Sequence, residues 1–335
     1  MAEPIATVVI PNYNGMRFLP RLIDSLNSQS ESRFKVTIVD DGSSDESVEY
    51  LRQTHGRIHL IVNERNLGFT GSCNAGMRAA RSPFVVLLNN DTHVDSDWMA
   101  QGLQAFDSAD VASVASLVVM ADPPHLIDTA GDVYSVAGGA VKRNHLMPRE
   151  TAGGLSRDCF SASGASAFFR RDCVERVGLL DEAFESYYED VDLGFRLAHA
   201  GYRCRFAPRS ICYHHLSSSY SPTGWRYHFN SARNAEIVWQ ADLPQTLQHR
   251  HRHARRLFLM LQGANKLRQG CFRAWYAGRR AAKSSSSWIA AKRLQSNADD
   301  PARIALIESR LTKNWWGLHV FSRFTKNALV GGTTE

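Results

Sequence analysis

Short apolar runs alternate with segments of helical periodicity in the first third of the chain. Four apolar runs, most of them rich in β-branched residues, predict strands at 6–10, 36–39, 60–62 and 84–88. The segments between them carry apolar or capping residues at helical positions and predict helices at 18–26, 46–53 and 72–80. This strand–helix alternation predicts a parallel, doubly wound α/β sheet with right-handed crossovers.

The pattern becomes less regular after residue 113. A strand is expected at 116–120, and the following stretch rich in Gly, Asp and Pro predicts a hairpin or a flap. Short strands are then expected at 202–206 and 211–213. The four serines at 284–287 predict a short linker.

Polar loops follow three of the predicted strands, at 11–15, 40–45 and 89–92. Because parallel strands end at the same edge of a sheet, these loops predict a pocket for a polar, phosphate-bearing ligand. Asp91 lies directly after a buried strand and offers the hard oxygen ligand that Mg²⁺ or Mn²⁺ prefers. The alternative is a polar turn without further function. The sequence contains neither GxGxxG nor GxxxxGK[ST], so a dinucleotide fingerprint and a P-loop are not supported.

A second set of candidate residues comes later in the chain. Glu189, Asp190 and Asp192 form an acidic cluster, with Arg196 one helical turn further on. A positioned carboxylate there would suit a general base, although acidic residues also favour the start of a helix for electrostatic reasons alone. The pair 214–215, two histidines after a strand, is either structural or placed at a metal or phosphate.

Composition limits the class of protein. Of the 335 residues, 44% are hydrophobic, which excludes wholesale disorder. The six cysteines include no CxxC pair, which argues against a zinc ribbon and fits a reducing cytoplasm. The start of the chain does not resemble a signal peptide, and no apolar run approaches the roughly 18 residues of a membrane span.

Charge is distributed unevenly along the chain. Residues 1–242 contain 22 Lys and Arg against 29 Asp and Glu, whereas residues 243–335 contain 17 against 4. The basic, Trp-bearing C-terminal stretch suits an anionic membrane surface. A pair of solvated helices packed on the first part of the chain is the alternative, and RNA is a third, less favoured partner.

Five motifs in the right order resemble the family 2 glycosyltransferases. They are Ile10–Asn14, Asp40–Asp45, Asn66–Gly68, Leu88–Thr92 and Tyr188–Leu193. The resemblance covers roughly residues 6–240 and is closest to bacterial rhamnosyltransferase-like members. It implies a GT-A fold and an inverting transfer from a nucleotide diphosphate sugar, with a divalent cation, Mg²⁺ or Mn²⁺.

The resemblance also assigns residues to the donor nucleotide. It places Pro11 and Tyr13 in the loop that lines the nucleotide pocket. Asp41, with Asp40 beside it, matches the carboxylate that accepts a hydrogen bond from the base of the donor nucleotide. Asn66 and Gly68 match the loop over the nucleotide.

Further positions match the metal site and the catalytic base of the family. Asn89, Asn90 and Asp91 take the place of the DxD motif, so Asp91 is expected to bind the metal. Asp190 matches the catalytic base, with Glu189, Asp192 and Arg196 as acceptor or supporting residues. His214 resembles the family's histidine near the metal and diphosphate, with His215 as the alternative.

We therefore expect a catalytic domain over 1–240, with a nucleotide half at 1–112 and an acceptor half at 113–240. A basic helical region with possible membrane association would follow over 241–335. The expected reaction moves a sugar, with a lean to rhamnose, to a hydroxyl of a glycan or lipid-linked acceptor in cell-surface polysaccharide synthesis. The expected location is cytoplasmic and peripheral on the inner membrane, and nucleic acid is not an expected partner.

Two other functions fit parts of the pattern. A sugar nucleotidyltransferase would use a similar sheet, but it normally has a Gly-rich basic loop after the first strand, which residues 11–15 do not supply. A non-catalytic module could use the basic tail as a membrane or RNA anchor. The predicted residue types favour transfer, because direct displacement needs one carboxylate as base and a cation for the leaving group, whereas hydrolases use a carboxylate pair.

Overall fold

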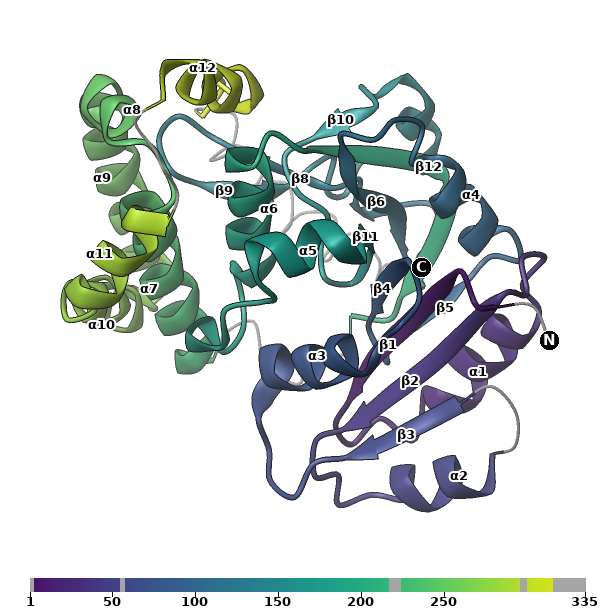
Figure 1. Ribbon diagram of the computed structural model, residues 1–335. Coiled ribbons are helices and arrows are strands. Elements are labelled where there is room, and N and C mark those ends of the chain that lie inside the picture. The colour runs from purple at the N-terminus through teal and green to yellow at the C-terminus, as the bar shows by residue number, and fades with distance from the viewer. Residues whose placement is uncertain (1–2, 55–57, 217–223, 296–299, 316–335) are drawn as a thin grey trace, which may run out of the picture. The chain divides into compact units, whose positions relative to one another are not determined.

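The computed structural model describes residues 3–54, 58–216, 224–295 and 300–315. The chain forms two compact units, which we describe separately (Figure 1). The first unit comprises Met1–Asp132 and Lys142–Ser217, and the second comprises Val133–Val141 and Ser218–Glu335. The chain passes between them at a two-stranded sheet of β8 (Asp132–Tyr134) and β9 (Ala140–Lys142).

A single mixed sheet of ten strands forms the centre of the first unit. Its strands are β1 (Ala6–Asn12), β2 (Phe34–Asp40), β3 (Ile58–Val62), β4 (Phe84–Leu88), β5 (Thr92–Val94), β6 (Val111–Met120), β7 (Ile127–Thr129), β10 (Asp158–Cys159), β11 (Ser166–Arg170) and β12 (Arg203–His214). The main order is β10-β12-β6-β11-β4-β1-β2-β3, with β5 paired to β12 and β7 to β6.

The direction of the strands brings the predicted loops together. Strands β1 to β4 are parallel, with Asn12 opposite Asp40 at the carboxyl ends of β1 and β2. Strand β11 runs antiparallel between β4 and β6, and β12 is parallel to β6, so that His214 lies opposite Met120. The ends of β1, β2, β4, β6 and β12 therefore share one edge, where open α/β sheets bind ligands.

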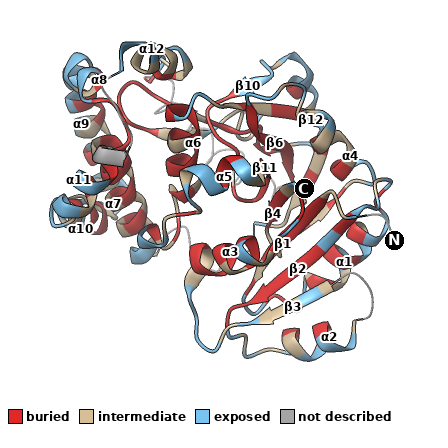
Figure 2. Ribbon diagram, in the orientation of Figure 1, coloured by how far each residue is buried: buried red, intermediate tan, exposed pale blue. Residues whose placement is uncertain are grey.

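Helices cover both faces of this sheet, because successive strand residues point to opposite sides (Figure 1). Val8 and Ile10 pack on the face covered by α1 (Leu19–Asn27), α2 (Ser47–Gln53) and α4 (Trp98–Gln104). Val9 packs on the other face, which is covered by α3 (Gly68–Ala79), α5 (Arg171–Val177) and α6 (Glu189–His199). Figure 2 shows that the central strands are almost wholly buried. Burying apolar side chains on both faces stabilises each by roughly 1.5–3 kcal/mol.

Several elements differ from the sequence prediction. The two short strands expected at 202–206 and 211–213 are one strand, β12, with an irregularity between Ala207 and Ile211. Strand β6 begins five residues earlier than expected, at Val111, and α3 begins at Gly68 instead of residue 72. Two short 3₁₀ helices, η1 (Arg149–Gly154) and η2 (Glu182–Phe184), lie in segments for which no helix was expected.

The second unit is helical. Its helices are α7 (Trp225–Ala241), α8 (Gln245–Arg250), α9 (Arg252–Arg268), α10 (Phe272–Lys283), α11 (Ser286–Gln295) and α12 (Pro301–Arg310). The linker expected at 284–287 is wrong, because only a two-residue turn separates α10 from α11. Glu236 of α7 binds Arg255 of α9 at 2.6 Å and Arg279 of α10 at 2.8 Å, which ties three helices together. Within the described part of the chain, no helix is both long and apolar enough to cross a bilayer.

Candidate active site

The carboxylate of Asp41, just beyond β2, is bonded on both oxygens by the chain itself. Oδ1 accepts from the backbone amide of Leu67 at 2.8 Å and from Nδ2 of Asn63 at 2.9 Å. Oδ2 accepts from the amide of Gly68 at 2.8 Å, and Asn66 donates to the Asp41 carbonyl at 3.2 Å. Asp41 therefore holds the 66–68 loop against the end of β2 and fixes the start of α3.

Asp40 begins a chain of hydrogen bonds that joins the ends of three strands. Its carboxylate accepts from the amide and hydroxyl of Ser43 at 2.9 and 2.7 Å and from Nδ2 of Asn12 at 2.8 Å. Asn12 in turn accepts from Nδ2 of Asn90 at 2.8 Å. Gly15 fits closely against this chain, since a Cβ there would lie 2.2 Å from both amide side chains. The loops after β1, β2 and β4 are thus locked to one another.

The remaining predicted residues of the nucleotide side lie along the same edge. Pro11 is the penultimate residue of β1, and Tyr13 is 44% exposed in the loop that follows. The amide of Asn89 donates to the carbonyl of Ala165 at 3.1 Å, which links the end of β4 to the loop before β11. The buried Oδ1 of Asn89 has no hydrogen-bond partner among the described residues.

Asp91 and His214 face each other at this edge. Nε2 of His214 lies 3.2 Å from Oδ1 of Asp91, and Nδ1 of His214 lies 2.9 Å from Oδ2 of Asp128. The fully buried Asp128 also binds the ammonium of Lys142, at 2.7 and 2.9 Å. Burial would lower the pKa of His214, but its bonds to the two carboxylates prevail and raise that pKa to about 9. His215 does not take this place: its ring lies against Phe18, 5.3 Å between centroids.

Asp190 sits in the first turn of α6. Its Oδ1 accepts from the amide of Val191 at 2.8 Å, and its Oδ2 accepts from the amide of Gly164 at 3.2 Å. The approach to this helix is strained, because Glu185, Tyr187 and Tyr188 have φ values of 63°, 72° and 72°. Left-handed backbone at residues other than Gly costs energy and is often found at functional sites.

Three carboxyl groups crowd together around the start of α6. Burial, followed by the charge of Asp190, raises the pKa of Asp132 and of Glu189 well above the usual range. Burial also raises the pKa of Asp190, against the two amide bonds and the positive charge of Lys142. Lys142 thus influences the carboxylate beside His214 and those at the start of α6. It binds Asp128 directly, and its positive charge opposes the rise in the pKa of Asp132 and Asp190.

Asp192 and Arg196 support the helix from inside. The buried Asp192 accepts from Nε of Arg196 at 2.8 Å. The guanidinium also donates to the carbonyls of Val177 at 2.9 Å and Leu179 at 2.8 Å, after the end of α5. This pair therefore anchors α6 to the preceding loop.

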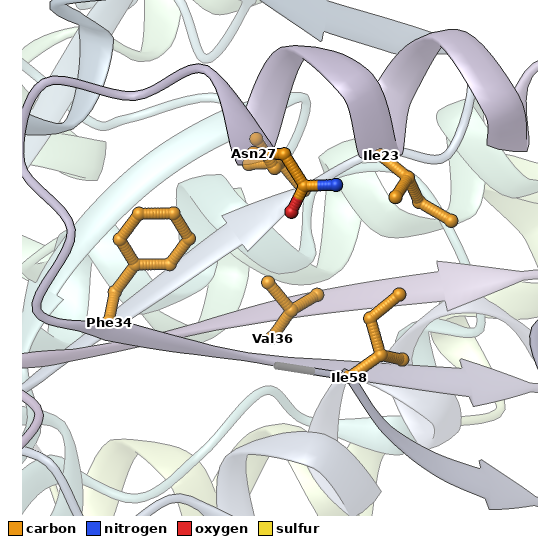
Figure 3. A pocket seen from close by; sticks show the side chains of 6 residues that line it. Ile23, Asn27, Phe34, Val36 and Ile58 are labelled. Atoms are coloured by element: carbon orange, nitrogen blue, oxygen red, sulfur yellow. The ribbon is translucent and has the colours of Figure 1, made fainter. Parts of the chain in front are cut away.

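Two cavities of the first unit lie away from these side chains. One, of about 10 Å³ and lined by α1 and neighbouring strands, holds at most one water molecule (Figure 3). The other is an open groove of about 650 Å³ lined by residues 95–97, 101, 117, 149–150, 152–153, 208–209 and 211. The candidate site is therefore defined by its side chains and not by either cavity.

Comparison with known proteins gives this set of residues a context. The family model described as Glycosyl transferase family 2 matches residues 7–178, more than half of the chain, from β1 to α5. The chain belongs to the family 2 glycosyltransferases. The match contains Asp40, Asp41 and Asp91, while Asp190 and His214 lie beyond it.

Relatives of this glycosyltransferase are found in several organisms. Over 211 residues it is 28% identical to the pre-mycofactocin glycosyltransferase of Mycobacterium tuberculosis, covering 62% of this chain and 42% of the relative. It is also 27% identical over 248 residues to the N-acetylglucosaminyl-diphospho-decaprenol L-rhamnosyltransferase of the same species, covering 64% of this chain and 77% of the relative. The chain spans under half the length of some relatives, including 25% of an uncharacterized Sinorhizobium fredii protein.

Solved structures share the fold of this glycosyltransferase. The mannosyltransferase PcManGT from Pyrobaculum calidifontis, in complex with GDP-Man and Mn²⁺, superimposes with a TM-score of 0.57 at 16% identity. The superposition covers 99% of this chain and 89% of that one. The transferase has the predicted GT-A fold.

The donor set suits a divalent cation. Asp91 offers an oxygen, and His214 offers a nitrogen once the ring has lost the proton that its raised pKa favours. A carboxylate on the second ring nitrogen, here from Asp128, is the usual support of a metal-binding histidine. Within the described ranges no cluster of three or more His, Cys, Asp or Glu side chains forms a complete metal site. A cation bound here would take its other ligands from phosphate and water, as Mg²⁺ commonly does.

Sequence reasoning missed three residues of this site: Asp128, Asp132 and Lys142. They come from the irregular stretch after β6, where no periodicity singles out a position. Asp128 meets His214 across 86 positions of sequence, so that only the fold reveals the pair. The available signal was weak: two aspartates next to short apolar segments.

Proposed function

We propose that this transferase moves a sugar, with inversion, from a nucleotide diphosphate donor to a hydroxyl of a glycan or lipid-linked acceptor. One observation carries the proposal. A single ammonium, that of Lys142, binds the carboxylate behind His214 and also acts on Asp190. This shared cation supports a single site at the ligand-binding edge of the sheet, to which the candidate cation residues and the candidate base would both contribute.

Asp190 is the proposed base. Its carboxylate is fixed by two backbone amides, and burial raises its pKa. A fixed carboxylate with raised proton affinity suits removal of a proton from an acceptor hydroxyl as that oxygen attacks the anomeric carbon. Burial also raises the pKa of Glu189 and of Asp132 well above the usual range, which favours the neutral forms of these two neighbours.

Asp91 and His214 are the proposed ligands of a divalent cation, Mg²⁺ or Mn²⁺. When bound, such an ion would neutralise charge that develops on the leaving diphosphate. Asp128 keeps the imidazole turned toward Asp91. The solved mannosyltransferase that shares this fold contains Mn²⁺ and GDP-Man, which supports a cation and a nucleotide donor here.

The nucleotide is proposed to lie over the locked loops of the other strands. The bonded network of Asp40, Asn12 and Asn90 and the loop held by Asp41 form a rigid floor. Tyr13, exposed in the first loop, is proposed to contact the nucleotide. A rigid floor suits binding, because little order is lost when the donor arrives.

Rhamnose and surface-polysaccharide synthesis are the proposed sugar and setting. They rest on the distant mycobacterial relative, which is an N-acetylglucosaminyl-diphospho-decaprenol L-rhamnosyltransferase. A nucleotide-sugar panel with Mn²⁺ and a diphospho-polyprenyl acceptor tests the proposal. We expect release of nucleoside diphosphate with one donor and an inverted anomeric configuration by NMR. Retained configuration would contradict the assignment of Asp190, and pyrophosphate formation from a sugar phosphate would indicate a nucleotidyltransferase.

A further inference from the structure

Helix α9 of the second unit exposes a row of large apolar side chains. Leu257, Met260 and Leu267 are 37%, 71% and 62% exposed. At 3.6 residues per turn they fall, with Ala264, on about a quarter of the helix circumference. Phe258, on the other side of α9, is buried within the unit, and so is Gly263, which lies at the edge of the row next to Trp275. Single exposed apolar residues are normal, but a row on one helix face indicates a binding surface.

Basic residues border this apolar row. Arg256 and Arg268 lie on the two sides of it and are exposed. The surrounding stretch, residues 243–298, contains twelve Lys and Arg and no Asp or Glu. The buried Arg255 is not part of this surface, since it faces inward and binds Glu236. The exposed face is therefore apolar in the middle and cationic at its margins, without acidic residues nearby in sequence.

We propose that this face of α9 docks on a bilayer rich in anionic phospholipid. Leu257, Met260 and Leu267 would enter the boundary between headgroups and acyl chains, and Arg256 and Arg268 would bind phosphate groups at the rim. This arrangement is typical of helices that lie in the membrane interface. RNA fits less well, because an exposed aliphatic row offers no stacking surface for bases. Docking itself does not depend on the transferase reaction; that it brings the active site to a lipid-linked acceptor rests on the proposed function.

Vesicle flotation with the full chain tests this proposal. Vesicles of equal parts phosphatidylcholine and phosphatidylglycerol are compared with pure phosphatidylcholine, at low and high salt. We expect the wild type to float with the anionic vesicles only, and less at high salt because the charges are screened. The combined Leu257→Ser, Met260→Ser and Leu267→Ser variant should lose about tenfold or more in partitioning. Val62→Ser, at a similarly exposed position of β3, is the matched control and should float like the wild type.

A second variant protects the test against a folding artefact. Arg256→Gln with Arg268→Gln leaves the apolar row intact and should weaken binding to anionic vesicles and remove most of its salt dependence. Circular dichroism of both variants should match the wild type, because all five side chains are exposed. Absence of wild-type binding to anionic vesicles would overturn the proposal, as would unchanged binding of both variants. Binding to single-stranded RNA without binding to vesicles would overturn it in favour of a nucleic-acid surface. Donor turnover, measured separately with a soluble acceptor, shows whether the reaction itself has failed.

Discussion

The two groups of acids at the edge of the sheet are bonded in opposite ways. On the nucleotide side, Asp40 and Asp41 each accept three hydrogen bonds from the chain. On the other side, Asp132, Glu189 and Asp190 crowd together, and buried Oε2 of Glu189 has no partner among the described residues. Asp190 accepts two hydrogen bonds and Asp132 one, so the second group has fewer donors for each carboxyl and its pKa values are raised. Carboxyl groups thus build the frame in one group and are the candidates for proton transfer in the other.

The largest effect is expected for Asp190→Asn. The amide cannot accept the acceptor's proton, so turnover should fall about 10²- to 10⁴-fold while donor binding is retained. Nucleoside diphosphate release and donor calorimetry measure the two quantities. Asp172→Asn is the matched control, because Asp172 makes the same bond to the next amide, 2.9 Å to Cys173, at the start of another helix. Equal turnover in the two variants would remove Asp190 from the mechanism.

Asp128→Asn should have the next largest effect. It takes away the negative charge that holds Lys142 and orients His214. The affinity for Mn²⁺ should weaken about 10- to 100-fold, as for other supporting carboxylates of metal-binding histidines. Electron paramagnetic resonance of Mn²⁺ provides a readout independent of turnover. Lys142→Met is the companion variant, and unchanged Mn²⁺ binding in Asp128→Asn would exclude the supporting role.

Asp41→Asn should affect stability and nucleotide binding together. The amide can accept on one atom only, so bonds to Leu67 and Gly68 cannot both persist. We expect a loss of about 2 kcal/mol in the free energy of unfolding by urea, together with weaker binding of nucleoside diphosphate. Asp24→Asn, at an exposed position of α1, is the control and should unfold like the wild type. An undisturbed stability would show that the 66–68 loop does not depend on Asp41.

Glu189→Gln should have the smallest effect, and its size should depend on pH. Because the folded-state pKa of Glu189 is raised above 4.5, its neutral form stabilises the fold at low pH, and this contribution is lost as pH rises through the folded pKa. Glutamine stays neutral, so the variant should melt higher than the wild type at about pH 8 and by less at about pH 5. Differential scanning calorimetry measures the difference. A lower melting temperature at the higher pH would contradict the shift.

Much of the sheet could be predicted because its signals are local. The runs that become β1, β2 and β4 are mostly apolar and end at polar turns, and they are strands in the structure. Helix α3 was placed too late because residues 68–71, Gly-Phe-Thr-Gly, have the composition of a turn. The structure makes them helical because Asp41, more than twenty positions earlier, captures the amides at the helix start.

The site was predictable only where it follows a strand or a motif. Asp91 lies three residues beyond β4 and His214 is the last residue of β12, and the structure brings the two side chains together. Asp128 and Lys142 could not be recognised as site residues from the sequence. Asp128 bonds Lys142 and His214 from distant segments of the chain, and no local pattern predicts these contacts. The role of Asp41 was equally hidden, because a count of its hydrogen bonds requires coordinates.

The left-handed residues before α6 have a consequence for the behaviour of the protein on warming. Glu185, Tyr187 and Tyr188 hold an unfavourable backbone, which local hydrogen bonds help to maintain, such as those from Thr70 to the Glu185 carbonyl and from the Asp192 amide to the Tyr188 carbonyl. Such a segment relaxes at a lower temperature than the sheet, since local opening requires less energy than global unfolding. Heat inactivation should therefore precede loss of the circular dichroism signal, and should reverse on cooling as long as the sheet has not melted.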